Sequence, residues 1–148
     1  MELAKELDVI YAGAAVAAAS NTDSNSTRID TADCEGVIFF TTITDSVQDG
    51  VATLKVEQNT ADSDTGMAAL SGASADLTSA ANDDLNGKVL MVSVHRPRER
   101  YLQGVRVSAT QNIAFGEIYA VKYGKRKQPV ADNSTIGEKA ATVSPAEA

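Results

Sequence analysis

The side chains with the most chemical potential in this sequence lie close together, in the stretch SVHRPRERYLQGVRV that begins at position 93. His95, Arg96, Arg98 and Arg100 are almost adjacent, and Tyr101 follows them. Arginine carries a planar fork of donors that fits both phosphates and carboxylates. The stretch is therefore suited to a nucleic acid, an anionic ligand or a protein partner, and the rest of the chain must decide among them.

Patterns typical of catalysis or metal binding are weak. The one histidine, His95, lies among arginines, and the one cysteine, Cys34, belongs to no nucleophile motif. Residues DSDTG at 62–66 resemble the start of a calcium loop, but the downstream glutamate of such a loop is missing. We therefore expect no catalytic residue, no metal site and no cofactor, and we expect Cys34 to be a small buried residue.

Charge is distributed unevenly along the chain, whose net charge is -7. Residues 1–85 hold 15 acidic and 3 basic side chains, whereas residues 86–127 hold 9 basic and 2 acidic ones. This polarity favours self-complementary or partner-directed electrostatics. Nucleic acid is not expected as a partner, because the acidic remainder repels phosphate and the basic region has too few aromatic side chains for a stacking platform.

The elements that must position these side chains are strands. Residues 51–58 alternate apolar and polar side chains with a period of two, and residues 36–44 are rich in β-branched and aromatic types. Strand patterns cover 26–31, 36–44, 51–58, 88–96, 101–110 and 113–124. Strands at short spacing without amphipathic helices predict an all-β fold, a β-sandwich or jelly roll. Pro97 makes the segment between the strands at 88–96 and 101–110 a corner or hairpin connection.

The predicted organisation has three parts. Residues 1–20 form an extended N-terminal arm or a lead-in strand, residues 21–131 form the β-sandwich domain, and residues 132–148 form a flexible C-terminal tail. As an arm, residues 1–20 are expected to order only against a neighbouring subunit or another partner surface. Residues 59–87 are small, polar and acidic, which predicts a long central loop excursion within the domain.

No segment is expected to enter a membrane. The longest apolar stretch, at 9–20, is too short and too alanine-rich to cross a bilayer. The acidic residues before it have the wrong charge for a signal peptide. We expect a soluble protein that is made inside the cell.

Several stretches together resemble a family of small structural proteins of tailed bacteriophages. They are STRIDTADCEGVIFF, ATLKVEQ, DDLNGKVLMVSVHRPRERYLQGVRV and IYAVKYGKRKQPV, and the resemblance covers residues 8–131. The proteins it resembles are capsid decoration proteins, also called cement proteins. The resemblance is strongest at the corner from His95 to Tyr101. The resemblance implies a virion protein on the capsid exterior, bound to the major capsid protein as a homo-oligomer, either a dimer or a trimer.

The predicted partner-binding residues come from the corner and from the arm. They are Arg96, Arg98, Arg100 and Tyr101, together with Val9, Ile10 and Tyr11. Two interpretations of the corner stay open. It is either a solvated turn whose arginines pair locally with Glu99, or a set of bidentate donors that docks onto carboxylates of a partner.

Other functions also stay open. A head-tail connector or a tail component of the virion fits the same resemblance. A carbohydrate-binding β-sandwich module is a further alternative, although the chain has no tryptophan. A small hydrolase ranks last, since it lacks an evident catalytic group.

Overall fold

The computed structural model describes residues 2–144, 146 and 147, and its regular structure is almost entirely β-strand. The elements are η1 (Leu3–Lys5), β1 (Asp8–Gly13), β2 (Val16–Ala19), β3 (Thr22–Asn25), β4 (Ile29–Asp30), β5 (Gly36–Ser46), β6 (Val51–Asn59), β7 (Ala68–Thr78), β8 (Val89–His95), β9 (Tyr101–Ala109) and β10 (Ile113–Tyr123). Within the described part of the chain, no helix has the length and apolar character needed to cross a membrane.

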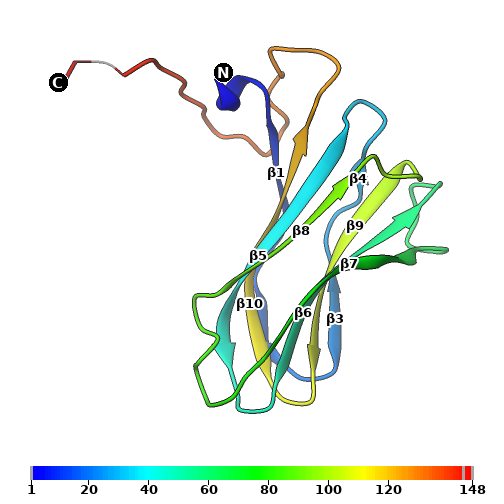
Figure 1. Cartoon of the computed structure of the whole chain (residues 1–148), viewed down its shortest axis with the longest axis vertical. Helices are drawn as coiled ribbons and strands as arrows, with labels where there is room; N and C mark the ends of the chain where they lie inside the picture. The colour runs from blue at the N-terminus through cyan, green and yellow to red at the C-terminus, as the bar shows by residue number, and fades with distance from the viewer. Residues whose placement is uncertain (1, 145, 148) are drawn as a thin grey trace.

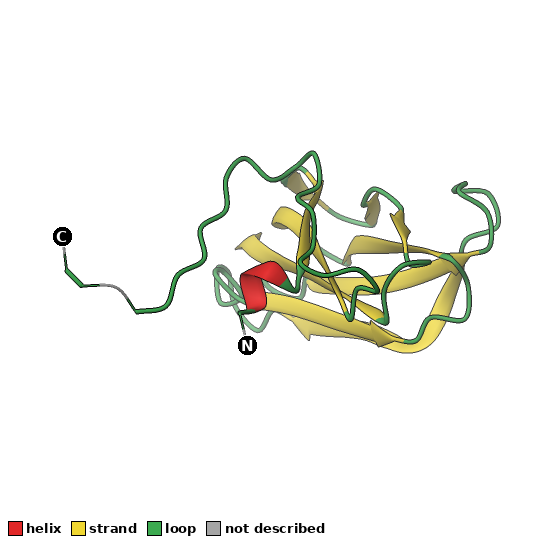
Figure 2. Cartoon of the chain, turned by 90° about the horizontal axis from the view of Figure 1, so that it is seen from above, coloured by secondary structure: helices red, strands yellow, loops and turns green. Residues whose placement is uncertain are grey.

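The strands form two antiparallel sheets that pack face to face (Figure 1). Sheet A has the order β1-β10-β5-β8, and β2 also pairs with β10. Sheet B has the order β3-β9-β6-β7, and β4 also pairs with β9. Seen from above, the two layers are distinct and η1 lies at one end (Figure 2). The predicted all-β sandwich is confirmed.

The core lies between the sheets and follows the period of the strands. Val37, Phe39 and Ile43 of β5 point inward and are fully buried, as are Leu54 and Val56 of β6. Successive side chains of a strand point to opposite faces, so the predicted alternation at 51–58 places its apolar set in this core. Cys34 is also buried in the core cluster, as expected.

The N-terminal segment is a strand of the sandwich, so its interpretation as an arm that orders only against a partner is wrong, and the alternative of a lead-in strand holds. Residues 8–13 form β1, which pairs with β10 from Asp8↔Lys122 to Tyr11↔Tyr119, and residues 16–19 form β2 against the same strand. The small side chains of this segment suit a strand, because its backbone is held by the ladder and its inward residue Ala12 is 1% exposed. The segment is part of sheet A.

The predicted long central excursion is also wrong in part. Residues 68–78 form β7, which pairs with β6 from Val51↔Thr78 to Gln58↔Ala68. Leu70 and Leu77 pack against the core from this strand, although the segment is rich in small and polar residues. Loops remain at 60–67 and 79–88 only.

The corner after β8 joins the two layers. β8 belongs to sheet A and β9 to sheet B, so the segment around Pro97 crosses between sheets and is not a hairpin. Arg96 has φ 53°, a left-handed conformation that non-glycine residues seldom adopt, and its N–H donates to the carbonyl of Glu35 at 2.7 Å. The chain thereby turns out of sheet A within one residue.

Arg106 links the two sheets from inside. It lies on β9, is 2% exposed, and its Nη1 donates to the carbonyls of Ala14 at 2.7 Å and Gly116 at 2.8 Å. Gly116 belongs to an irregular stretch of β10, where the register with β5 shifts between Phe115 and Ile118. Burial lowers the pKa of the Arg106 guanidinium. This arginine of the basic stretch is a structural residue of the core.

We predict that replacing Arg106 with methionine lowers the free energy of unfolding by about 2–4 kcal/mol, because two buried carbonyl groups lose their donor. Chemical denaturation followed by circular dichroism measures this change. The matched control is Arg98→Met, at an exposed position of the same basic stretch, which we expect to change stability by less than about 0.5 kcal/mol. Equal stabilities of the two variants would contradict the structural role of Arg106.

We also predict that deleting residues 1–20 lowers the midpoint of thermal unfolding or prevents folding, because it removes β1 and β2 and leaves the edge of β10 unpaired. Deleting residues 140–148 serves as the control and should leave the midpoint unchanged. A cooperative, undiminished transition in the N-terminal deletion would restore the interpretation of this segment as an arm.

Candidate interaction surfaces

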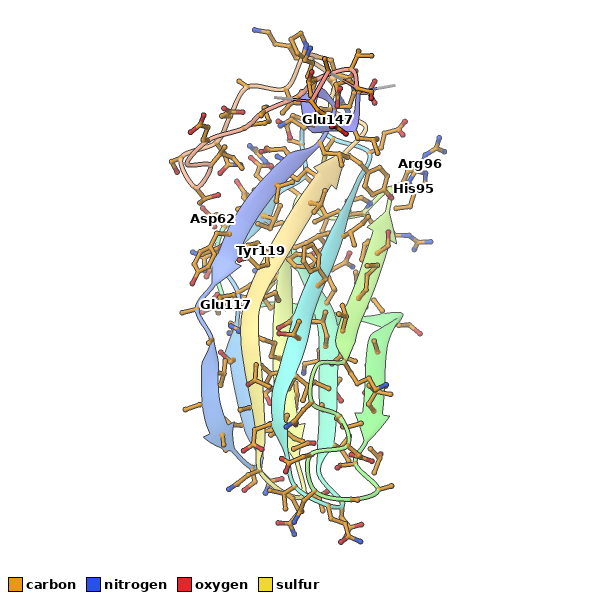
Figure 3. All side chains as sticks on the ribbon, turned by 90° about the vertical axis from the view of Figure 1, so that its left-hand side faces the viewer. Asp62, His95, Arg96, Glu117, Tyr119 and Glu147 are labelled. Atoms are coloured by element: carbon orange, nitrogen blue, oxygen red, sulfur yellow. The ribbon has the colours of Figure 1, made fainter. Side chains whose placement is uncertain are left out.

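The three predicted arginines of the corner, Arg96, Arg98 and Arg100, line a cavity at the end of the sandwich. Its volume is about 560 Å³. It is lined by Thr31, Ala32, Cys34, Glu35, Arg96, Pro97, Arg98, Glu99, Arg100 and Arg126. Four arginines from two distant segments therefore meet there, and Arg126 is the member that the sequence did not predict. In Figure 3 the side chain of Arg96 extends away from the end of β8.

Arg100 is already held inside the chain. Its Nε donates to Asp30 Oδ1 at 2.9 Å and its Nη2 to Asp30 Oδ2 at 2.8 Å, which is a bidentate pair. The hydrogen bond from Arg100 lowers the pKa of Asp30 to about 2. The guanidinium carbon of Arg100 lies 5.3 Å from the centre of the Tyr101 ring, so a cation–π contact with Tyr101 also holds the arginine in place.

Arg96 and Arg98 differ from Arg100 in their surroundings. Both side chains are exposed, and neither forms an ion pair with any residue that the structure describes. The two interpretations of the corner thus apply to different residues. The fork of Arg100 is satisfied by Asp30, although Glu99 was the expected local partner, whereas the forks of Arg96 and Arg98 stay available.

The fold neutralises part of the charge asymmetry along the sequence, since three of the nine basic residues of 86–127 pair with aspartates of 1–85. Basic residues pair with acidic residues far away in the chain. These pairs include Arg28 with Asp62 and Asp64, Lys122 with Asp33, Lys125 with Asp8 and Asp33, and Arg100 with Asp30. The two aspartates of the DSDTG stretch are thus occupied by Arg28, and Asn59 closes that loop by donating to the carbonyls of Ser63 and Thr65.

A second surface lies on the outer face of sheet A, which Figure 3 shows from the front. Register places Tyr11 of β1 beside Tyr119 of β10, Tyr119 beside Phe40 of β5, and Phe40 beside Met91 of β8. Tyr11 and Tyr119 meet edge to face at 5.7 Å between ring centres, and Phe40 and Tyr119 stack at 5.4 Å. An aromatic row of Tyr11, Tyr119 and Phe40 therefore crosses three strands, and Met91 continues it on the fourth.

The aromatic row has apolar neighbours on either side. Val9, Val121 and Ile38 form the next row, and Val89 extends the face at the far strand. Four large apolar side chains of this face are strongly exposed, namely Val9 (37%), Tyr11 (42%), Val89 (54%) and Met91 (59%). A contiguous exposed apolar face on a rigid sheet is typical of an interaction surface. We call it the outer face of sheet A.

The predicted N-terminal residues divide between the two sides of β1. Val9 and Tyr11 lie on the outer face of sheet A, whereas Ile10 packs against the core. Ile10 is therefore not placed for partner contact in the folded chain. The alternation of side chains along a strand is the signal that separates them, and it was missed because this segment was expected to be an arm.

His95 and Tyr123 connect the outer face to the arginine corner. Their rings stack with 5.9 Å between centres, and His95 Nδ1 lies 3.1 Å from the Tyr123 hydroxyl. Between them, Gly36 provides the space, because a Cβ there would lie 2.3 Å from the Tyr123 oxygen. His95 thus acts as a packing residue at the boundary of the two surfaces. No group of three or more metal-ligating side chains is assembled among the described residues.

Comparison with known proteins gives a structural match only. No family model matches the sequence, and no curated protein matches it. Among solved structures, the chain is similar to the PBSX exported protein XepA, with a TM-score of 0.51 and 15% sequence identity. The alignment covers 97% of this chain and 45% of that one, so this chain spans less than half the length of XepA. The likeness shows a shared fold.

We predict that Arg100→Ala raises the pKa of Asp30 from about 2 toward the ordinary value for an aspartate, because the bidentate partner is lost. The pair stabilises the fold above the unfolded-state pKa of Asp30, and that contribution disappears as the pH falls through about 2. The effect on stability is small, since both side chains are about half exposed. Titration of the Asp30 carboxyl by nuclear magnetic resonance gives the pKa, and an unchanged value would contradict the pairing.

Proposed function

We propose that this protein is a structural component of a tailed-phage particle, a decoration protein that binds the outer surface of the major capsid protein and stabilises the head. The observation that carries the proposal is the outer face of sheet A, an apolar surface with a continuous aromatic row beside an arginine corner. Two further points support it. The sequence resembles phage decoration proteins, and the fold is similar to that of a protein from the phage PBSX.

The surface has the composition of a protein-docking site. Buried aromatic anchors contribute most of the energy of such contacts, and Tyr11, Tyr119 and Phe40 are held in fixed positions by their mutual packing. Strands position these rings without the entropy cost of ordering a loop. A shell that repeats the same partner many times adds the contacts of every bound copy to the stability of the whole head.

The arginine corner fixes the orientation of the protein on its partner. Arg96 and Arg98 present unpaired forks, and an arginine fork recognises carboxylates with fixed geometry. We assign their partners to acidic side chains of the capsid protein. Arg100 and Tyr101 contribute indirectly, because Arg100 is bound to Asp30 and lies over the Tyr101 ring, and these contacts hold the corner in place.

A carbohydrate-binding module is the second candidate, and the aromatic row is the observation that favours it. Flat sheet faces with exposed tyrosines also stack against sugars. The arginine corner has no role in that alternative, whereas it borders the docking face in the first. A head-tail connector or tail component uses the same surfaces at another place in the virion.

We predict that the purified protein sediments with heads of its parent phage that lack it, and that Tyr11→Lys weakens this binding at least about tenfold, because a charge replaces an exposed aromatic contact of the outer face. Leu3→Lys is the matched control, since Leu3 is 53% exposed but lies on η1, outside the outer face.

Three outcomes would contradict the proposal. They are equal binding by Tyr11→Lys and Leu3→Lys, attachment to tails in place of heads, and specific hits on a glycan array that Tyr11→Lys abolishes while head binding is absent. The second result favours the connector or tail role, and the third favours the carbohydrate-binding module.

A further inference from the structure

The edge strand β8 is open on one side. It is the last strand of sheet A and pairs with β5 alone among the described strands, from Gly36↔His95 to Thr42↔Val89. A hollow of about 300 Å³ lies between its end and β7 of the other sheet, lined by residues that include Leu70, Gly72 and Ser93. The backbone groups on its free side therefore have no strand beside them within the described chain.

The opposite edge of sheet A is protected. Asn133 Nδ2 donates to the carbonyl of Val9 at 2.8 Å, and the N–H of Tyr11 donates to Thr135 Oγ1 at 3.1 Å. Side chains of the C-terminal segment thus satisfy backbone groups along β1 in the way that a neighbouring strand would. Such covering of an edge prevents pairing with another chain.

The edges of sheet B are also unsuitable for pairing. One is divided between β3, of four residues, and β4, of two residues. The other, β7, contains Gly72 with φ 79° and carries Asp76, which would face a like charge in a self-paired strand. Among the four edges of the sandwich, β8 alone lacks such a feature.

The composition of β8 selects the occupant. Its seven residues, VLMVSVH, include no proline and no formally charged side chain, in a chain whose net charge is -7. Antiparallel pairing of a strand with its own copy sets each residue opposite the one at the mirrored position, so a strand without charged residues brings no like charges together in any register. The exposed side chains of Val89 and Met91 then lie beside outward-facing side chains of β8 in the second copy.

The size of the outer face points to the same occupant. Four strands about 4.8 Å apart, with seven residues rising about 3.3 Å each, give a projected area of about 440 Å² for one copy. A stable protein interface takes about 800 Å² from each partner. Two copies joined at β8 double the face and reach that size. Only this area comparison rests on the proposed function.

We propose that β8 is a homodimer interface, in which the β8 strands of two copies pair antiparallel across a two-fold axis and join the two A sheets into one. The contact is isologous, so it closes at two copies. The dimer presents two outer faces side by side and an arginine corner from each copy.

Sedimentation velocity of the full chain, over a wide range of concentrations and without capsids, tests this interface. We expect a monomer-dimer equilibrium whose dissociation constant rises at least about tenfold in Met91→Lys and in Val89→Lys, because a lysine on an edge strand opposes its pairing with another strand. Tyr11→Lys is the matched control. It lies on the outer face at the far strand, so it should leave the dimer intact while weakening head binding.

A monomer at all concentrations would overturn the inference, and so would a trimer. A dimer that dissociates in Tyr11→Lys but not in Met91→Lys would also overturn the inference. That result would mean that the outer faces of sheet A of two copies pack against each other, in place of pairing at β8. If the lysine variants fail to fold, hydrogen exchange of the wild-type chain decides, since pairing predicts that β8 amides gain protection as the concentration rises. Failure of head binding alone leaves this dimer measurable and contradicts only the proposed function.

Discussion

The buried guanidinium of Arg106 is the constraint on which the arrangement of the sandwich depends. A charge that is 2% exposed is tolerated only where hydrogen bonds replace water, and the carbonyls of Ala14 and Gly116 provide them. One of these carbonyls lies between β1 and β2, and the other lies in the irregular stretch of β10. The side chain therefore fixes the N-terminal strands, β10 and the opposite sheet relative to one another.

The outer face of sheet A is a consequence of that arrangement. The aromatic row needs Tyr11 beside Tyr119, which requires β1 to lie in register along β10. Gly13 contributes at the end of β1, because a Cβ there would lie 3.0 Å from the guanidinium of Arg106. The buried charge of Arg106 and the aromatic row thus lie on opposite faces of sheet A. The proposed contacts with a capsid and with a second copy use the outer face and the β8 edge, which this packing leaves exposed.

Local patterns in the sequence predicted most of the strands and part of the candidate site. β5, β6, β8, β9 and β10 follow from runs of β-branched residues and from alternation, and the arginine corner follows from Pro97 between two strands. β7 was missed because its residues are small and carry weak local preference, so its place is decided by pairing with β6. β1 holds Val9, Ile10 and Tyr11, which favour a strand, but the alanine-rich residues that follow led to the interpretation as an arm. The aromatic row was hidden because its three rings, with Met91 beside them, come from four segments that only the folded sheet brings together. The role of Arg106 has no local signal, since its partners are backbone carbonyls brought close only by the folded sheets.

A cryo-electron microscopy map of the parent phage particle tests the central claim most directly. The account predicts density for the sandwich on the outside of the head, with the outer face of sheet A turned toward the major capsid protein and the arginine corner at the same contact. Density for this chain only at the neck or tail would contradict it. So would a decorated head on which sheet B faces the shell and the aromatic row points to solvent.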